Sequence, residues 1–141
     1  MAPIRLALAA AALAATLAPA AAAPLPEASW ETCNRRPASE IPNCVISADT
    51  IRLGRSNRLA TVDSPDLNGP QCDAERELAL TAAETMGALL REGGWQVVTT
   101  GQADPDGRPM IRLERDGVEI GELLIAAGVA RSVDDPVEGW C

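Results

Sequence analysis

The chain has 141 residues, 12 of them basic and 20 acidic, and a formal net charge of −8 at pH 7. It contains no histidine, tyrosine or phenylalanine, which excludes histidine acid–base chemistry, histidine metal sites and stacking of bases on tyrosine. An acidic protein binds polyanions poorly, because affinity for phosphates rises with the number of cationic contacts. Any chemistry on nucleic acid must therefore depend on a local cluster of arginines, the only basic residue type in the chain.

Residues 1–22 are predicted to be a cleaved signal peptide. Arg5 is followed by an Ala/Leu-rich run, and small residues lead up to Pro24. The run is shorter than the roughly 20 apolar residues of a membrane span, and an uncleaved N-terminal anchor is the alternative. With cleavage after Ala22, the mature protein has 11 basic residues against 20 acidic ones, a net charge of −9. We expect it to be secreted or periplasmic, with no membrane span.

Residues 23–43 are predicted to be an N-terminal arm, followed by one domain over residues 44–141. Four cysteines in a small exported chain indicate two disulfides, for which three pairings are possible. We prefer Cys33–Cys44, which closes a short loop, and Cys72–Cys141, which ties the C-terminus, with Trp140 packed on the bridge, to the middle of the chain. A zinc site is the alternative, but the sequence has no CxxC pair and no histidine.

The first half of the domain is predicted to form short strands. Residues 45–46 and 51–53 are strand-like, and residues 54–57 are predicted to be a turn. Residues 58–62 form the next predicted strand. Ser64-Pro65 ends it, because proline cannot donate to a strand ladder and the residue before it avoids the helical region.

A long helix with Asp73 as its N-cap and an end at Gly93-Gly94 is predicted next. Its apolar stripe consists of Leu78, Ala82, Met86, Leu89 and Leu90. Strands are predicted at 95–100, 110–113 and 118–120, with a turn at Asp116-Gly117, and a short helix at 122–127. The pattern indicates an α+β domain, a small β-barrel with packed helices, and propensity alone does not separate an OB-type barrel from other α+β layouts.

Three aspartates and two arginines could together act on a phosphodiester. Carboxylates hold hard cations such as Ca²⁺ and can serve as general bases, and guanidinium groups contact phosphate oxygens in pairs. The candidates are Asp49, Asp63, Asp66, Arg58 and Arg108. Taken singly, each aspartate could equally be a turn former, and each arginine a solvated charge.

The order of six motifs resembles the thermonuclease (staphylococcal nuclease-like) family over about residues 44–131. The motifs are Ser47-Ala48-Asp49-Thr50, Arg58-Leu59, Asp63-Ser64-Pro65-Asp66, Asp104-Pro105-Asp106-Gly107-Arg108, Gly121-Glu122-Leu123-Leu124 and Gly128-Val129-Ala130. The resemblance implies a five-stranded OB-fold β-barrel with packed helices over residues 44–141.

The resemblance also implies a calcium site. Asp49 and Asp63 would bind Ca²⁺, with help from the backbone carbonyl of Ser64. The metal turn of the family is Asp-Gly-Asp, whose first two positions are Ser47 and Ala48 here. We expect a weakened site, because one carboxylate is lost and alanine adopts a strained turn less freely than glycine.

By the same resemblance, Arg58 and Arg108 would bind the scissile phosphate, and Asp66 would be the general base. The family has glutamate at that position, and aspartate is shorter by about 1.5 Å. A displacement on the order of 1 Å can cost about 100-fold in rate. Asp106 adds a negative charge where a polyanion would approach.

Two functions are therefore predicted. The first is an exported Ca²⁺-dependent nuclease with reduced activity, which acts as a monomer on DNA or RNA and prefers single strands. The second is a catalytically impaired OB-fold binding or interaction module of the cell envelope. An exported disulfide-stabilised domain unrelated to nucleases remains a third interpretation, since Asp, Pro and Gly form turns for local reasons.

Overall fold

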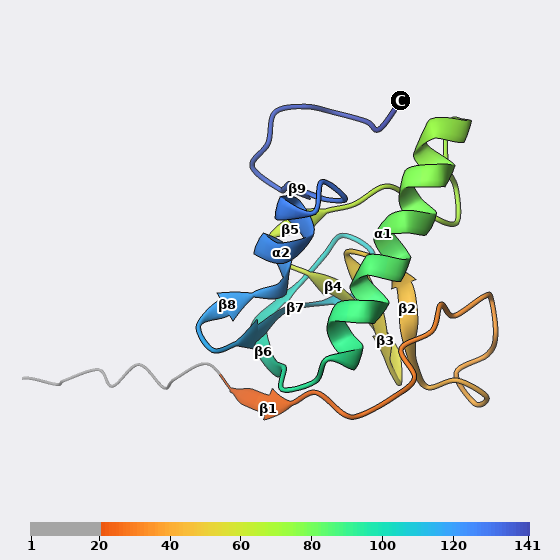
Figure 1. Cartoon of the computed structure of the whole chain (residues 1–141). Coiled ribbons are helices and arrows are strands. Elements are labelled where there is room, and N and C mark those ends of the chain that lie inside the picture. Colours follow the sequence, from red (N-terminus) through yellow and green to blue (C-terminus); the bar gives the residue numbers. More distant parts are fainter. Residues whose placement is uncertain (1–20) are drawn as a thin grey trace, which may run out of the picture.

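The computed structural model describes residues 21–141, so most of the predicted signal peptide lies outside the described residues. The described chain is α+β, as predicted (Figure 1). Its elements, in order, are β1 (Ala22–Pro24), β2 (Asn43–Ser47), β3 (Thr50–Leu53), β4 (Arg55–Leu59), β5 (Val62–Asp63), α1 (Asp73–Arg91), β6 (Gln96–Ala103), β7 (Pro109–Arg115), β8 (Val118–Glu119), α2 (Ile120–Ala126) and β9 (Arg131–Ser132). None of the helices over residues 21–141 combines the length and the apolar character needed to cross a membrane.

The main sheet is a curled half-barrel. It has seven strands in the order β1-β6-β7-β4-β3-β2, with β8 on β7, and β5 pairs separately with β9. All neighbours are antiparallel except β4 and β7, which run parallel. The predicted five-stranded closed barrel differs from this arrangement: β1 and β2, the end strands, do not pair with each other within the described residues. The architecture is compatible with an OB-like fold.

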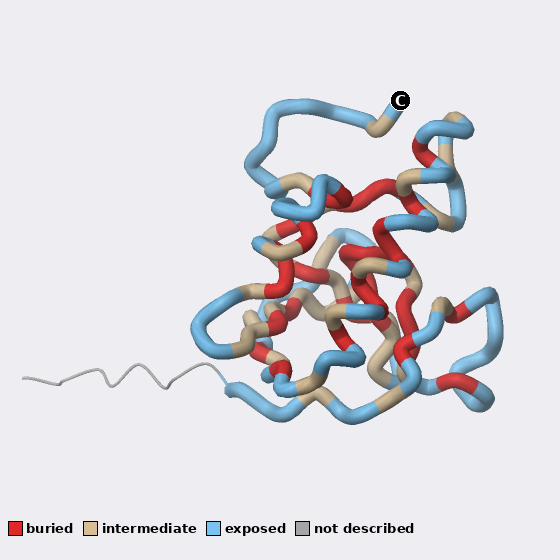
Figure 2. Tube along the Cα trace, viewed as in Figure 1, coloured by how far each residue is buried: buried red, intermediate tan, exposed pale blue. Residues whose placement is uncertain are grey.

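Helix α1 covers the sheet and contributes a buried face to the core (Figure 2). Its N-cap is Cys72, not the predicted Asp73, and the Cys72 sulfur accepts a hydrogen bond from the Glu75 N–H. Gly87 lies in this buried face, where an added Cβ would approach the Trp30 carbonyl oxygen to 2.7 Å. Because Gly87 has no side chain, the N-terminal arm can pack closely against the helix.

The predicted arm is part of the packed structure. Its first residues form β1, an edge strand on β6, and the rest is mostly irregular. Trp30 is 2% exposed and belongs to the main core. The cysteines are joined in the preferred pairs, Cys33–Cys44 and Cys72–Cys141.

One of the two predicted hairpin turns is confirmed and the other is wrong. Asp116 and Gly117 have φ values of 51° and 77°, as the predicted tight turn between β7 and β8 requires. The predicted turn over residues 54–57 is wrong, because β4 already begins at Arg55 and only Gly54, with φ of 67°, reverses the chain. A single glycine in the left-handed region suffices there, so the next three residues are free to pair with β3.

Candidate functional site

The parallel pairing of β4 with β7 brings together the two arginines that the sequence singled out. Arg58 lies opposite Met110, and β7 begins at Pro109, directly after Arg108. Both arginines line one pocket of about 270 Å³, whose apolar wall includes Met110 and Val133. We call this the arginine pocket. Its formation depends on a contact between strands that are far apart in the sequence.

Both guanidinium groups have unused hydrogen-bond donors. Arg58 donates through Nη2 to Asp63, and Arg108 donates through Nε to Asp104. Among residues 21–141, neither Nη1 atom forms a hydrogen bond to the protein. The side chains are 23% and 30% exposed, so an anion in the pocket could reach both. An anion would compete with Asp63, which is 50% exposed, and with Asp106, 3.4 Å from Arg108 and 79% exposed.

A turn built around Asp104 holds Arg108 in place. Asp104 Oδ1 accepts hydrogen bonds from the backbone N–H groups of Asp106 (3.0 Å) and Arg108 (2.8 Å), and Oδ2 accepts one from Arg108 Nε (2.6 Å). Desolvation opposes ionisation of this carboxyl, but the hydrogen bonds and positive charge of Arg108 outweigh it and lower the pKa of Asp104 below its usual value. Asp104 is therefore a positioning residue for Arg108.

The lowered pKa gives the Asp104 turn a pH-dependent contribution to stability. Because the folded pKa lies below the unfolded value of about 3.9, this contribution is complete above that value and is lost as pH falls through the folded pKa. Asp104→Asn should lower the thermal midpoint near neutral pH, and the difference from wild type should shrink below about pH 4. Thermal unfolding at a series of pH values measures this.

Asp116→Asn is the matched control, because Asp116 also occupies a turn but its carboxylate accepts no hydrogen bond in the described residues. Asparagine also adopts the left-handed conformation found there. A stability difference for Asp104→Asn that stayed constant down to the lowest pH would contradict the role given to its ionised form.

Asp49 lies in the turn between β2 and β3 with its carboxylate saturated by donors. Ser47 Oγ (2.7 Å) and Thr50 Oγ1 (2.8 Å) donate to Oδ1, and the Ser64 N–H (2.9 Å) and Arg58 Nη2 (3.2 Å) approach Oδ2. An ionised carboxylate has about four acceptor positions, so all of them are occupied. The side chain is only 6% exposed. Asp49 thus ties the turn to β4 and to the segment after β5.

The predicted metal ligands lie together but do not fit a calcium site. Arg58 Nη2 is 3.2 Å from Asp49 and 3.0 Å from Asp63, so a cationic side chain already joins the two carboxylates. Ser64, which was predicted to contribute its backbone carbonyl, donates its N–H to Asp49 Oδ2 and accepts the Asp49 N–H on its hydroxyl. Ca²⁺ takes six to eight oxygen ligands, whereas only Asp63 has a partly exposed carboxylate. In the described part of the chain, no group of three or more acidic, cysteine or histidine residues could hold a metal.

Asp66, the predicted base, does not line the arginine pocket. Its Oδ1 accepts hydrogen bonds from the N–H groups of Asn68 (2.8 Å) and Gly69 (3.1 Å) within its own loop. Glu75, buried in the first turn of α1, accepts the Asp66 N–H (3.1 Å) and the Gln71 N–H (2.7 Å). The carboxylate of Asp66 thus shapes the loop, and the pair Asp66–Glu75 fixes that loop to the helix.

The C-terminal tail contacts Asp63. Strand β9 pairs with β5 and places Arg131 opposite Asp63. The guanidinium of Arg131 lies 3.9 Å from the centre of the Trp140 ring and donates to the Gly139 carbonyl, while Trp140 Nε1 donates to Asp63 Oδ2 at 3.3 Å. A cation over an indole face is attracted by the ring electrons. The tail loops back past β9 toward the start of α1 (Figure 1).

Sequence reasoning placed Trp140 on the Cys72–Cys141 bridge and gave Arg131 no role. In the structure the Trp140 ring packs against Arg131 and reaches Asp63. No local pattern predicts this contact, because Asp63 and Trp140 are 77 residues apart. The only available signal was the long disulfide, which brings the C-terminus back to the middle of the chain.

Comparison with known proteins does not identify a family. A scan against protein-family models and a search of curated proteins found no match. The resemblance to thermonucleases therefore stays a prediction that depends on the six motifs and their order.

Proposed function

We propose that this chain is an exported module that binds phosphate esters, single-stranded nucleic acid among them, on an OB-like scaffold and hydrolyses them poorly or not at all. The observation that carries the proposal is the arginine pocket, in which Arg58 and Arg108 both have unused N–H donors. Guanidinium groups suit phosphate because they stay charged and present several donors in a plane.

Three features support binding without efficient turnover. Asp49 has no free acceptor for a cation, Asp63 is held by Arg58, and Asp66 lies outside the arginine pocket. Hydrolysis needs a base within reach of a water at the phosphate. The predicted base does not line the pocket. The two carboxylates that do line it, those of Asp104 and Asp106, both pair with Arg108.

An oxidising compartment fits this proposal. Two disulfides, one of them buried, are typical of exported proteins and rare in the reducing cytosol. Together with the predicted signal peptide at 1–22, they support a secreted or periplasmic location.

A Ca²⁺-dependent nuclease of low activity is the second candidate. The specific observation in its favour is that the two arginines predicted to hold the scissile phosphate do share one pocket. The donor set around Asp49 argues against it, because Ca²⁺ could bind there only after the hydroxyls and Arg58 had moved.

Removal of the Arg108 charge should weaken binding of single-stranded DNA. We expect Arg108→Gln to raise the Kd for a short radiolabelled oligothymidylate about tenfold in filter binding at low salt, because one charge-assisted contact is lost. Asp106→Asn should have the opposite effect and lower the Kd, since it removes the exposed competitor of the phosphate. Arg112→Gln is the matched control: Arg112 loses the same charge but pairs with Glu114 outside the pocket.

The same mixtures, run on a denaturing gel with Ca²⁺ and with chelator, separate the two candidates. Binding without cleavage supports the module. Cleavage that requires Ca²⁺ and disappears in Arg108→Gln supports the nuclease. Equal binding by wild type, Arg108→Gln and Arg112→Gln would contradict both, because neither function could then depend on the arginine pocket.

A further inference from the structure

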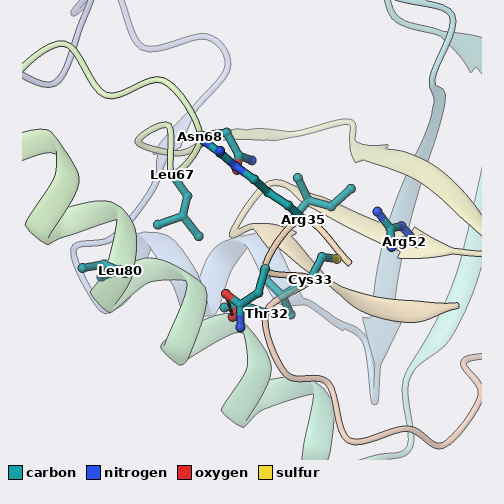
Figure 3. Close-up of a pocket in the computed structure, with 10 residues that line it drawn as sticks. Thr32, Cys33, Arg35, Arg52, Leu67, Asn68 and Leu80 are labelled. Carbon is teal, nitrogen blue, oxygen red and sulfur yellow. Dashed lines mark hydrogen bonds between the residues drawn. The ribbon is translucent and has the colours of Figure 1, made fainter. Parts of the chain in front are cut away.

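A second pocket, away from the arginine pocket, lies between the N-terminal arm and helix α1 (Figure 3). Its volume is about 520 Å³, within the range of roughly 300–1,000 Å³ that is typical of small-molecule sites. The disulfide-bonded arm, strands β2 and β3, the loop after β5 and the outer face of α1 all contribute to its walls. We call it the arm pocket.

The arm pocket is basic, although the protein is acidic. Arg35 and Arg52 line it, and no carboxylate from the described residues does. In the arginine pocket, by contrast, each arginine faces two carboxylates. The lining of the arm pocket carries two positive charges and no negative one, in a chain with 20 acidic and 12 basic residues. Its charge favours an anionic ligand.

Arg35 supplies the available charge. Its side chain is exposed and extends across the pocket toward Asn68 (Figure 3), and it forms no ion pair within residues 21–141. Its backbone has φ of 58°, and that of Asn34 is 46°, a conformation that is uncommon for arginine. The Cys33–Cys44 disulfide next to them closes the loop that holds this conformation. The guanidinium is therefore presented on a constrained loop with its donors free.

Arg52 closes the opposite side of the pocket. Its Nη1 donates to the carbonyls of Arg36 (2.7 Å) and Ile41 (3.4 Å), so its position is fixed by the arm. The apolar part of the lining consists of Val45, Leu67 and Leu80, with Ile46. Leu80 projects from α1 and is 50% exposed. The pocket thus combines an apolar wall with two arginines, of which only Arg35 has a free guanidinium.

We propose that the arm pocket binds a small amphiphilic anion, a carboxylate or phosphate monoester with a short aliphatic body. The head group pairs with Arg35, near Asn68, and the aliphatic body lies against Leu67 and Leu80. The charge-assisted contact provides orientation, and burial of apolar surface provides much of the affinity. The arm pocket shares no lining residue with the arginine pocket, so this proposal does not rest on the proposed phosphate-ester function.

Isothermal titration calorimetry of the mature protein with octanoate, octyl phosphate and octanamide tests the proposal. We expect saturable binding of at least one anion, and binding at least about tenfold weaker for uncharged octanamide. Arg35→Gln should weaken anion binding about tenfold or more, and Leu80→Asp, an exposed position that tolerates substitution, should do the same by repulsion. Arg112→Gln, with the same loss of charge outside both pockets, should leave the affinity unchanged.

The difference between octanoate and octyl phosphate identifies the preferred head group. The proposal is overturned if neither anion binds saturably, if octanamide binds as well as the anions, or if Arg35→Gln or Leu80→Asp binds like wild type. It is also overturned if Arg112→Gln weakens binding as much as Arg35→Gln, since the effect would then come from net charge. Circular dichroism of each variant establishes that it is folded.

Discussion

Replacement of Asp49 by alanine is expected to lower the free energy of unfolding by about 3–5 kcal/mol, the usual cost of removing one partner from a buried ion pair. The variant leaves Arg58 without its buried carboxylate and the Ser47, Thr50 and Ser64 donors without their acceptor. Urea unfolding followed by circular dichroism measures the loss.

Asp73→Ala is the matched control for this prediction. Asp73 also pairs with an arginine, at 3.0 Å from Arg76, but its side chain is 90% exposed. Exposed pairs contribute about 0–1 kcal/mol, so the control should unfold close to wild type. An Asp49→Ala variant that was no less stable than Asp73→Ala would show that the network around Asp49 contributes little to folding.

Loss of the Cys72–Cys141 disulfide is expected to cost on the order of 4 kcal/mol in the chain-entropy model, because the bridge closes a loop with a sequence separation of 69. Serine at both positions is the best substitution, since Cys72→Ser would keep a side-chain acceptor for the N-cap of α1. Urea unfolding measures the stability, and amide hydrogen exchange measures the protection of residues 131–141.

The Cys33–Cys44 bridge is the natural comparison, because its sequence separation is 11 and the same model gives about 3 kcal/mol. If the tail is held mainly by the long bridge, residues 131–141 lose protection only in the Cys72/Cys141 variant. Unchanged protection there would mean that Arg131, Trp140 and Asp63 hold the tail without the disulfide.

Much of the fold could be predicted from local patterns. The long helix has an apolar stripe ended by two glycines, and Asp116-Gly117 fits a turn that needs two positive φ values. The number of cysteines in a small exported chain indicated two disulfides, and the preferred one of the three possible pairings is the one observed. The start of β4 could not be predicted, since Gly54-Arg55-Ser56-Asn57 has the composition of a turn while the pairing of residues 55–57 with β3 decides their conformation.

The site was only partly predictable, because it too depends on contacts between residues that are distant in the sequence. The motifs selected Arg58 and Arg108, and the structure places both in the lining of one pocket. The partners of a carboxylate are not visible in a sequence. Whether Asp49 has free lone pairs depends on three hydroxyl and backbone donors and one guanidinium, and Ser64, in the expected metal set, is one of those donors.

The contact between Trp140 and Asp63 gives the protein an internal optical reporter. With no tyrosine or phenylalanine in the chain, all aromatic emission comes from three tryptophans. Trp30 and Trp95 are 2% and 1% exposed, in the core, whereas Trp140 lies at the surface under Arg131. A ligand that takes Arg58 away from Asp63, or Arg131 away from the Trp140 ring, changes the surroundings of one indole and leaves the other two as a constant background. Occupancy of the site can therefore be followed in the unlabelled protein by its own fluorescence.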